Sequence, residues 1–398
     1  TGPGGYTSDL AEYLVQQGEE VTVLTSFPHY PLWRLYPGFK QGFFPKSVLN
    51  GVKIIRCPIY IPQSPGAFKR ILYDLSFTLS SAFAGLFTGK YDIIYCISPP
   101  LTIGLTANFL SLLKKCPFIF HIMDLVPDTP IALGMLNNQA VINMLYSLER
   151  YVYKNADGIV AISPGYLRNL ADKHVPLEKA ALLPNWIDID VITPGERVNN
   201  FRQRNKLDGH EFLVTYAGNM GNKQGLETLL QAAELIQNGN KNNVKFLMVG
   251  EGARKKFLLD YARRRNLKNV IFLPLQPAED FPGLLSASDA LVITQRSSVV
   301  DICLPGKLMT NCASGRPILA AVNRESETAR FINEAGCGII VEPEKPVALL
   351  EGILKLKDSP DLARSLGAKG RKYVENFYSR DKVLNSFHHF IKKIAEIH

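Results

Sequence analysis

The sequence alternates between short apolar runs and longer stretches with helical periodicity, and this alternation limits the fold more than any other feature. The apolar runs of the first half occupy residues 20–28, 52–62, 91–100, 116–125 and 156–164. Those of the second half occupy residues 212–218, 244–252, 270–277, 290–296, 317–322 and 337–343. Runs that are apolar throughout are typical of strands buried on both faces of a parallel sheet. The sequence therefore predicts an α/β protein with doubly wound, Rossmann-like sheets.

Stretches with one apolar face fill the gaps between these runs and predict helices. In the first half they cover residues 6–17, 67–88, 102–114, 139–154 and 165–173. In the second half they cover residues 225–237, 254–265, 281–287, 305–313, 325–335, 346–357 and 360–373. Because a glycine turn like the one before the first helix normally follows a strand, we expect a first strand upstream of Thr1.

Proline and polar residues interrupt the alternation near the middle of the chain. A chain of 398 residues is also long for a single hydrophobic core. We therefore predict two Rossmann-like domains that face each other across a cleft. The expected parts are an N-terminal domain over residues 1–184, a linker over 185–211, a C-terminal domain over 212–375, and a C-terminal helix over 376–398 that crosses back toward the first domain.

The charge and the cysteines indicate the surroundings of the chain. The net charge of +9 suits anionic partners, which include nucleic acid, anionic lipid and phosphate-bearing substrates. Six scattered cysteines without a close pair are typical of a cytoplasmic protein. Residues 71–89 are mostly apolar and are flanked by Lys69, Arg70 and Lys90. This segment is marginal for a membrane span, so it is either a buried domain helix or a helix that partly meets the inner leaflet of the membrane.

Each half contains a glycine-rich turn before a helix: Gly2, Gly4 and Gly5 in the first half, and Gly218, Asn219, Gly221 and Gly225 in the second. Such turns let a phosphate approach the backbone amides at the start of a helix, although α/β folds also use glycine there for the turn alone. Neither turn matches the dinucleotide-binding or the Walker pattern. The sequence therefore disfavours redox cofactors and P-loop hydrolysis.

A third phosphate-site candidate is the sequence Pro305-Gly306-Lys307 at the expected start of a helix. Positive charge at a helix N-terminus is unfavourable unless an anion is near, which favours a pyrophosphate partner for Lys307 over a solvated lysine.

The motifs PNWID, GNMGNKQGLETLLQAA, VGEG and LPGKL…SGRPILA, in this order along the chain, resemble those of family 4 glycosyltransferases with the GT-B fold. The likeness is greatest to bacterial sugar transferases of capsule, colanic acid and O-antigen assembly, including fucosyl- and N-acetylfucosaminyltransferases. TGPGGYTSDLAEYL, SFPHYP and FHIMDLVPD are similar to that subgroup as well.

The resemblance implies a retaining transfer of a sugar from a UDP or GDP donor, held mainly by the C-terminal domain, to an acceptor held by the N-terminal domain. It implies no metal and no other cofactor. The implied catalytic residues are His121, Lys307 and Asp301, and Asp124 and Asp128 either bind the acceptor or cap helices. The implied donor-binding residues are Gly4, Gly5, Gly218, Asn219, Gly221, Lys223, Gln224, Leu273, Pro305, Gly306 and Leu308.

The chain departs from the family pattern where many members carry two glutamates. Ile302 and Thr310 occupy those positions, and Asp301 could stand in for the first. Asn219 and Gln224 replace the common Arg and Lys, which moves positive charge to Lys223, Lys307 and Arg296.

The resemblance and the basic charge together predict a cytoplasm-facing enzyme peripheral to the bacterial membrane. Its acceptor would be an undecaprenyl-diphosphate-linked saccharide. Nucleic acid is not expected as a partner, because the basic runs fall on predicted surface helices. The alternatives are a UDP-sugar epimerase of the same fold and a non-catalytic protein that binds anionic ligands.

Overall fold

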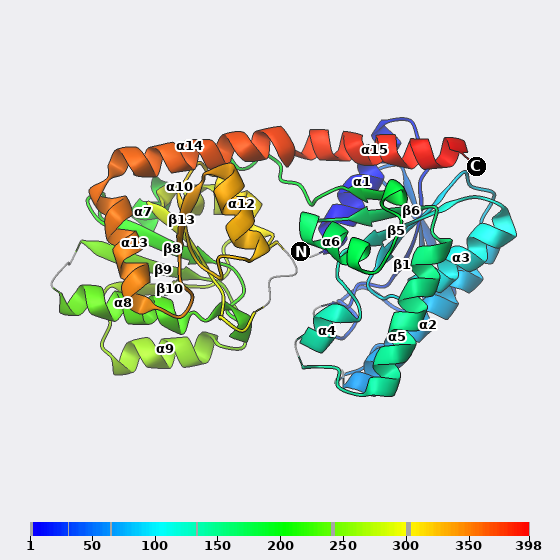
Figure 1. The fold of residues 1–398 in the computed structure, drawn as a ribbon, viewed down its shortest axis with the longest axis horizontal. Helices are drawn as coiled ribbons and strands as arrows, with labels where there is room; N and C mark the ends of the chain where they lie inside the picture. The colour runs from blue at the N-terminus through cyan, green and yellow to red at the C-terminus, as the bar shows by residue number, and fades with distance from the viewer. Residues whose placement is uncertain are drawn as a thin grey trace. The chain divides into compact units, whose positions relative to one another are not determined.

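The computed structural model describes residues 3–30, 32–63, 66–132, 134–239, 243–299 and 304–397. The chain forms two compact units (Figure 1). The first comprises residues 1–184 and 383–398, and the second comprises residues 185–382. The segment expected to be a separate linker, residues 185–211, therefore belongs to the second unit.

The first unit contains two small sheets. The strands β1 (Thr22–Ser26), β3 (Val52–Cys57) and β2 (Lys46–Leu49) form one, in that order, and the other has the order β4 (Ile94–Ser98), β5 (Phe118–Ile122), β6 (Gly158–Ala161) and β7 (Ala180–Leu182). The helices are α1 (Pro3–Gln16), α2 (Ala67–Leu86), α3 (Ile103–Lys114), α4 (Asp128–Ala132), α5 (Gln139–Asn155), α6 (Pro164–Asp172) and the short η1 (Leu177–Lys179).

The second unit contains one six-stranded parallel sheet. Its strand order is β10 (Val270–Leu273), β9 (Val244–Val249), β8 (Phe212–Ala217), β11 (Ala290–Thr294), β12 (Ile318–Ala321) and β13 (Gly338–Val341). The helices are α7 (Asn200–Arg204), η2 (Asn222–Gln224), α8 (Glu227–Asn238), α9 (Lys255–Arg264), α10 (Phe281–Ala287), α11 (Lys307–Ala313), α12 (Glu327–Ala335), α13 (Pro346–Asp358) and α14 (Pro360–Phe377). The last helix, α15 (Arg380–Ile397), begins in this unit, and its residues from Val383 onward belong to the first unit.

Both faces of the six-stranded sheet are covered, which explains why its strands are mainly apolar and show no alternation with polar residues. Leu213 of β8 packs with residues of α10, α11 and α12 on one face. Its neighbour Val214 packs with residues of α8, α9 and α13 on the other. Successive side chains of a strand point to opposite faces, so both sets of side chains on each strand are mainly apolar. The predicted doubly wound parallel architecture is confirmed for this unit.

The first unit differs from the prediction at β2, an antiparallel strand that the sequence analysis missed. All four residues of β2 are exposed. The strand is joined to β3 through Asn50 and Gly51, which both have positive φ angles, 49° and 82°. An Asn-Gly pair with this backbone conformation makes a tight hairpin turn. That pair was a hairpin signal available in the sequence.

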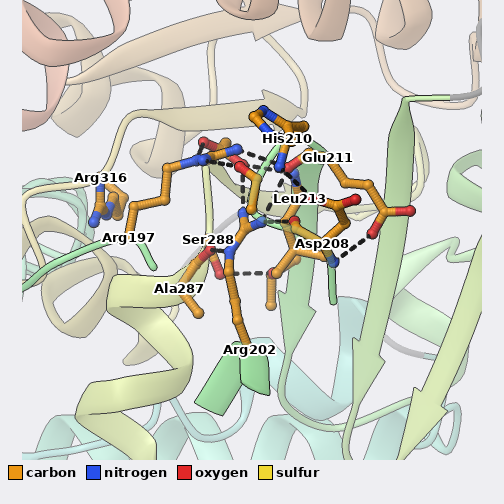
Figure 2. Close-up of polar contacts among 12 residues, drawn as sticks. Arg197, Arg202, Asp208, His210, Glu211, Leu213, Ala287, Ser288 and Arg316 are labelled. Atoms are coloured by element: carbon orange, nitrogen blue, oxygen red, sulfur yellow. Dashed lines mark hydrogen bonds and ion pairs between the residues drawn. The ribbon is translucent and has the colours of Figure 1, made fainter. Parts of the chain in front are cut away.

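Within the second unit, a network of arginines holds residues 195–211 against the six-stranded sheet (Figure 2). Arg202 is 1% exposed, and its guanidinium group donates to the backbone carbonyls of Ala287, Asp208 and Glu211. Its Nη2 also lies 2.8 Å from Oδ2 of Asp289, and Arg197 pairs with Oδ1 of the same carboxylate. Buried charges need this degree of pairing. The network lies where β8 and β11 begin, at the amino ends of these strands, so it supports the fold and not a ligand site.

Helix α15 is held against the first unit. His388 Nε2 lies 2.8 Å from Oε1 of Glu19, and Lys392 Nζ lies 3.1 Å from the same oxygen. Gly158 of β6 leaves room for Phe390 and Ile394, since a Cβ atom there would lie 3.1 to 3.2 Å from their side chains. Within the part of the chain that the structure describes, none of the helices has both the length and the apolar content needed to cross a bilayer.

Candidate functional site

The glycine turn after β8 lies at the carboxyl end of an inner strand of the six-stranded sheet. Parallel α/β sheets bind their ligands at this edge. Gly218 has a φ angle of 144°, which side-chain-bearing residues rarely adopt. The Tyr216 hydroxyl donates to the backbone carbonyl of Asn219 at 2.6 Å. The Gly221 amide donates to Oε1 of Gln224 at 3.1 Å. The turn is therefore held in one shape by its own side chains.

A second glycine turn follows β9. Its backbone packs directly against the backbone of the turn after β8. A Cβ atom on Gly250 would lie 1.9 Å from the Gly218 carbonyl oxygen, and one on Gly252 would lie 2.5 Å from that of Met220. The glycines of the VGEG motif are thus required for close approach of the two turns and are not themselves evidence of a ligand.

Lys307 begins α11, and its side chain points toward the β8 turn. The Nζ atom lies 3.8 Å from the centroid of the Tyr216 ring and 3.9 Å from the position that a Cβ atom on Gly218 would occupy. The residue as a whole is half-buried, but the Nζ atom is shielded from solvent and has no hydrogen-bond partner among the described residues. Burial lowers the pKa of Lys307 to about 7. A shielded ammonium group with only a ring face beside it can accept an anionic ligand.

Arg296 joins three loops at the same edge of the sheet, and its guanidinium group is occupied by protein partners. It donates to the Asn222 carbonyl at 2.7 Å and pairs with Glu227 at 3.1 Å and with Glu344 at 3.2 Å. Glu344 also accepts from the Ser297 amide at 2.9 Å. Arg296 therefore positions the loops, which differs from the expectation that it supplies positive charge to the ligand.

Glu227 shows how strongly this edge is fixed by charge pairing. Burial alone would raise its pKa, but a backbone hydrogen bond and the guanidinium groups of Arg254 and Arg296 together lower it. The carboxylate therefore stays ionised and holds both arginines.

The remaining residues expected at the donor site differ in their placement. Lys223 is exposed in η2, Leu273 is half-buried at the end of β10, and Pro305 and Gly306 precede α11. The Leu308 side chain lies fully buried in the core, and its amide donates to the Pro305 carbonyl, so its side chain is not available to a donor. Asp301 and Ile302 lie outside the described residues.

Gly4 and Gly5 lie in the first turn of α1, which begins at Pro3, earlier than the predicted start at residue 6. Both are exposed, and a Cβ atom on either would meet nothing within 4 Å. Open space beside the backbone is what an approaching ligand needs, and their donor role remains a prediction. Gly2 lies outside the described residues.

His121 lies within β5, inside the predicted apolar run 116–125. The side chain is 4% exposed, its Nδ1 lies 2.8 Å from the Tyr95 hydroxyl, and the ring contacts Phe387 of α15 at a centroid distance of 5.6 Å. Burial lowers its pKa to about 3, so the imidazole is neutral at physiological pH. These contacts account for Nδ1 and the ring face, but Nε2 is buried and has no hydrogen-bond partner among the described residues. The contact of His121 with the transferred sugar remains a prediction.

Asp124 and Asp128 both have partners within the chain. Asp124 accepts from the Thr129 hydroxyl at 2.8 Å. Asp128 pairs with Lys173 at 2.5 Å and accepts from Tyr146 at 2.7 Å and from Asn169 at 3.1 Å. These contacts favour the structural interpretation over acceptor binding for Asp128, because its carboxylate already has three side-chain partners.

Sequence reasoning missed Tyr216, Glu227 and Glu344 as parts of the site. Tyr216 belongs to an apolar strand and looked like core. Glu227 and Glu344 look like ordinary surface carboxylates until the fold brings them to Arg296, 69 and 48 residues away.

Family models match almost the entire chain. The model described as a glycosyl transferase 4-like domain matches residues 1–186, and the model described as glycosyl transferases group 1 matches residues 198–373. The chain belongs to the family 4 glycosyltransferases. The predicted family is thereby confirmed, and the division between the two matches falls at the start of the second unit.

Similar proteins agree with this assignment. The colanic acid biosynthesis glycosyl transferase WcaI of Escherichia coli is 29% identical over 395 residues, which is 97% of this chain and 95% of that protein. O-antigen chain mannosyltransferase C of Escherichia coli is 22% identical over 82% of this chain and 94% of its own length.

Solved structures show that this glycosyltransferase has the GT-B fold. Sucrose-phosphate synthase from Thermosynechococcus elongatus superposes with a TM-score of 0.78 at 18% identity, covering 100% of this chain and 94% of that one. HepE from Anabaena, solved in complex with UDP, gives a TM-score of 0.67 at 14% identity over 86% of both chains. The predicted GT-B architecture of two Rossmann-like domains is confirmed.

Proposed function

We propose that this glycosyltransferase moves a sugar from a UDP or GDP donor to a lipid-linked saccharide during surface polysaccharide assembly. The observation that carries the donor part is the shielded ammonium group of Lys307 beside the Gly218 turn. The Arg and Lys that the family commonly uses in this turn are Asn219 and Gln224 here, and Gln224 is engaged with the Gly221 amide. Lys307 is therefore the cation best placed to meet the donor diphosphate.

In the proposed reaction, the bond between the sugar C1 and the diphosphate oxygen breaks, and its electron pair leaves with the diphosphate. The acceptor hydroxyl oxygen bonds to C1 on the same face, and its proton ends on the leaving diphosphate. The charge that develops on the diphosphate is stabilised by Lys307 and by the amides of the β8 turn. The proposal requires no metal ion, since these groups supply the positive charge.

The lipid part of the proposal rests on an exposed apolar surface of the first unit. At the carboxyl ends of α2 and α3, Phe83, Phe87 and Leu112 are 43%, 72% and 72% exposed, and Phe43 is 84% exposed. The Phe43 and Phe87 rings both lie beside Phe83, at centroid distances of 6.2 and 5.0 Å. Exposed apolar groups gathered in this way mark interaction surfaces.

Basic residues border this surface. Lys114, the last residue of α3, donates to the carbonyls of Thr88 and Gly89 just beyond α2, and Lys90 and Lys115 are neighbours in sequence. Aromatic side chains beside lysines suit the interface of a membrane with anionic lipid headgroups. We therefore propose that the enzyme binds the inner face of the bacterial membrane from the cytoplasm.

The names of the relatives support surface polysaccharide as the product class, since they refer to colanic acid and O-antigen. Fucose and N-acetylfucosamine are the proposed sugars, on the strength of the sequence motifs shared with that subgroup.

The transfer is tested by incubating the enzyme with radiolabelled UDP and GDP sugars and vesicles that contain an undecaprenyl-diphosphate-linked monosaccharide. The expected result is a labelled lipid product with one donor. Conversion of a UDP-sugar to its epimer without acceptor would instead support the epimerase alternative. No product from any donor would contradict the proposal.

Membrane binding is tested separately by sedimentation with vesicles that contain anionic phosphatidylglycerol. The double substitution of Phe43 and Phe87 to Ser should reduce the bound fraction at least about tenfold, since each exposed phenylalanine contributes about 1.5–3 kcal/mol when fully buried. The matched control is Phe377→Ser, which replaces a phenylalanine 59% exposed on α14 of the other unit. Equal binding by both variants would contradict the assigned surface.

A further inference from the structure

An aromatic cluster lies just beyond the carboxyl end of β1 in the first unit, and neither the donor site nor the exposed phenylalanine surface includes it. The cluster consists of His29, Tyr30 and Trp33 from the loop after β1, and Tyr73 from α2. The Trp33 ring meets that of Tyr73 edge to face at a centroid distance of 5.4 Å, and that of Tyr30 at 6.3 Å.

Two hydrogen bonds fix the base of this aromatic cluster. His29 is 4% exposed, and its Nδ1 lies 2.6 Å from the Phe27 carbonyl oxygen. A carbonyl oxygen can only accept, so Nδ1 donates to it, and Nε2 lies within hydrogen-bonding distance of the Tyr73 hydroxyl, at 3.0 Å. The loop and α2 are thus joined through a histidine.

Two rings of the aromatic cluster are accessible to solvent. Tyr30 is 65% exposed and Trp33 is half-buried. Trp33 also has a φ angle of 51°, a left-handed conformation that is rare for a bulky residue and is kept only where the surroundings enforce it. Such backbone strain gathers at ligand sites more often than in ordinary loops.

Polar groups border the rings. Burial raises the pKa of the Tyr73 hydroxyl, and the nearby Asp74 carboxylate and Tyr30 hydroxyl raise it further. Asp74 is half-buried beside Tyr73 on α2. Aromatic faces bordered by a carboxylate match a pyranose, whose axial C–H groups form an apolar face and whose hydroxyls form a polar rim.

The location also fits a saccharide. Ligands of parallel α/β sheets bind beyond the carboxyl ends of the strands, and the aromatic cluster follows β1 at that end. We propose that the aromatic cluster of His29, Tyr30, Trp33 and Tyr73 is a saccharide-stacking subsite that holds the sugar of the acceptor, an assignment that rests on the proposed transferase function.

The test uses the intrinsic fluorescence of Trp33. The sequence contains two tryptophans, so Trp186→Phe leaves Trp33 as the single indole. The probe is octyl β-D-glucopyranoside below its micelle concentration, and the control ligand is tetraethylene glycol mono-octyl ether, which has the same alkyl chain and no sugar. Because stacking uses the apolar face of the ring, a glucoside serves as a general pyranose probe.

The expected result is a saturable change in Trp33 emission with the glucoside and not with the ether. Tyr30→Ser in the same background should weaken the apparent affinity for the glucoside about fivefold or more, as expected when one exposed ring contact is lost. Phe377→Ser, an exposed aromatic residue of the second unit, is the matched control and should leave the affinity unchanged.

Three outcomes would overturn the assignment: no saturable change, an equal change with the ether, or an unaltered affinity in the Tyr30 variant. Each outcome is separable from failure of the proposed transferase function. Binding of UDP and GDP to the same protein reports on the Lys307 site alone and does not involve the aromatic cluster.

Discussion

The Nζ atom of Lys307 lies 3.8 Å from the centre of the Tyr216 ring, and the hydroxyl of that same ring donates to the Asn219 carbonyl at 2.6 Å. One tyrosine therefore supports both the candidate cation and the turn that faces it. The phenol ring excludes water from the ammonium group, and its face offers the partial negative charge that a cation prefers.

Tyr216→Phe and Tyr216→Leu should separate these two contributions. The Phe variant keeps the ring under Lys307 and loses only the hydrogen bond to Asn219, so nucleoside diphosphate affinity should fall about threefold to tenfold. The Leu variant loses both and should bind more weakly than the Phe variant. Isothermal titration with UDP and GDP measures the difference, and equal affinities of the two variants would show that the ring face contributes nothing.

The stability of the protein should depend on pH through Lys307. Burial holds its folded-state pKa at about 7, below the usual 10.5, so between these values the unfolded chain binds more protons and stability rises with pH. Below pH 7 both states are protonated and the cost of burying the charge is fully present. Lys307→Met removes that cost, so its stability relative to wild type should be greatest below pH 7 and should decline as pH rises toward 10.5.

This change in relative stability should be on the order of 3 kcal/mol between about pH 6.5 and pH 9.5, measured by urea unfolding. Lys345→Met, at an exposed position before α13, controls for the loss of one positive charge. A difference between wild type and Lys307→Met that stays constant over this range would contradict a buried ammonium group.

Arg202 and Asp289 should be coupled in stability and not in catalysis. Arg202→Met removes one of the two cations that pair with Asp289 and the donor to three backbone carbonyls, so it should destabilise the second unit by about 3–5 kcal/mol. The double variant with Asp289→Asn should lose less than the sum of the single variants, because the carboxylate that Arg202 neutralises is then absent. Urea unfolding of the three variants gives the coupling energy, and strict additivity would argue against the pairing.

His121→Asn tests whether His121 serves packing or catalysis. Asn can still form a hydrogen bond with the Tyr95 hydroxyl, so transfer activity should stay within about fivefold of wild type. The folded-state pKa of His121 is about 3, below the usual 6.5. The contribution of the neutral histidine to stability is therefore fully present above pH 6.5 and is lost as pH falls toward 3. The variant should lose less stability than wild type between about pH 7 and pH 4.5. A loss of transfer activity above about a hundredfold with unchanged stability would instead establish the sugar contact.

The sequence predicted the strands of both units well because a doubly wound sheet leaves its pattern in the apolar runs. It missed β2, whose four residues are exposed and leave no apolar run, although Asn50 and Gly51 marked its turn. It also missed β7, whose three residues are too few to stand out as a run. It also missed α4, since a helix of five residues is too short to show periodicity.

The candidate site was predictable only in part. Lys307 stood out because its charge is unfavourable at a helix start, and the structure places it beside the Gly218 turn as expected. Its contact with Tyr216 could not be predicted, because Tyr216 belongs to a strand whose every residue looked like core. Asp128 shows the opposite error: its pairing with Lys173, 45 residues away, depends on tertiary structure that local pattern does not encode.

The most direct test of the account is calorimetric titration of wild type and Lys307→Met with UDP and GDP at about pH 7.5, in two buffers of different ionisation enthalpy. With its pKa at about 7 in the free protein, Lys307 should take up a fraction of a proton as the diphosphate binds. Wild type should therefore bind one of the two nucleotides with proton uptake, and the variant should bind it about ten to a hundred times more weakly without uptake. Equal affinity and equal proton uptake in the two proteins would contradict the role of Lys307 as the counter-ion of the diphosphate.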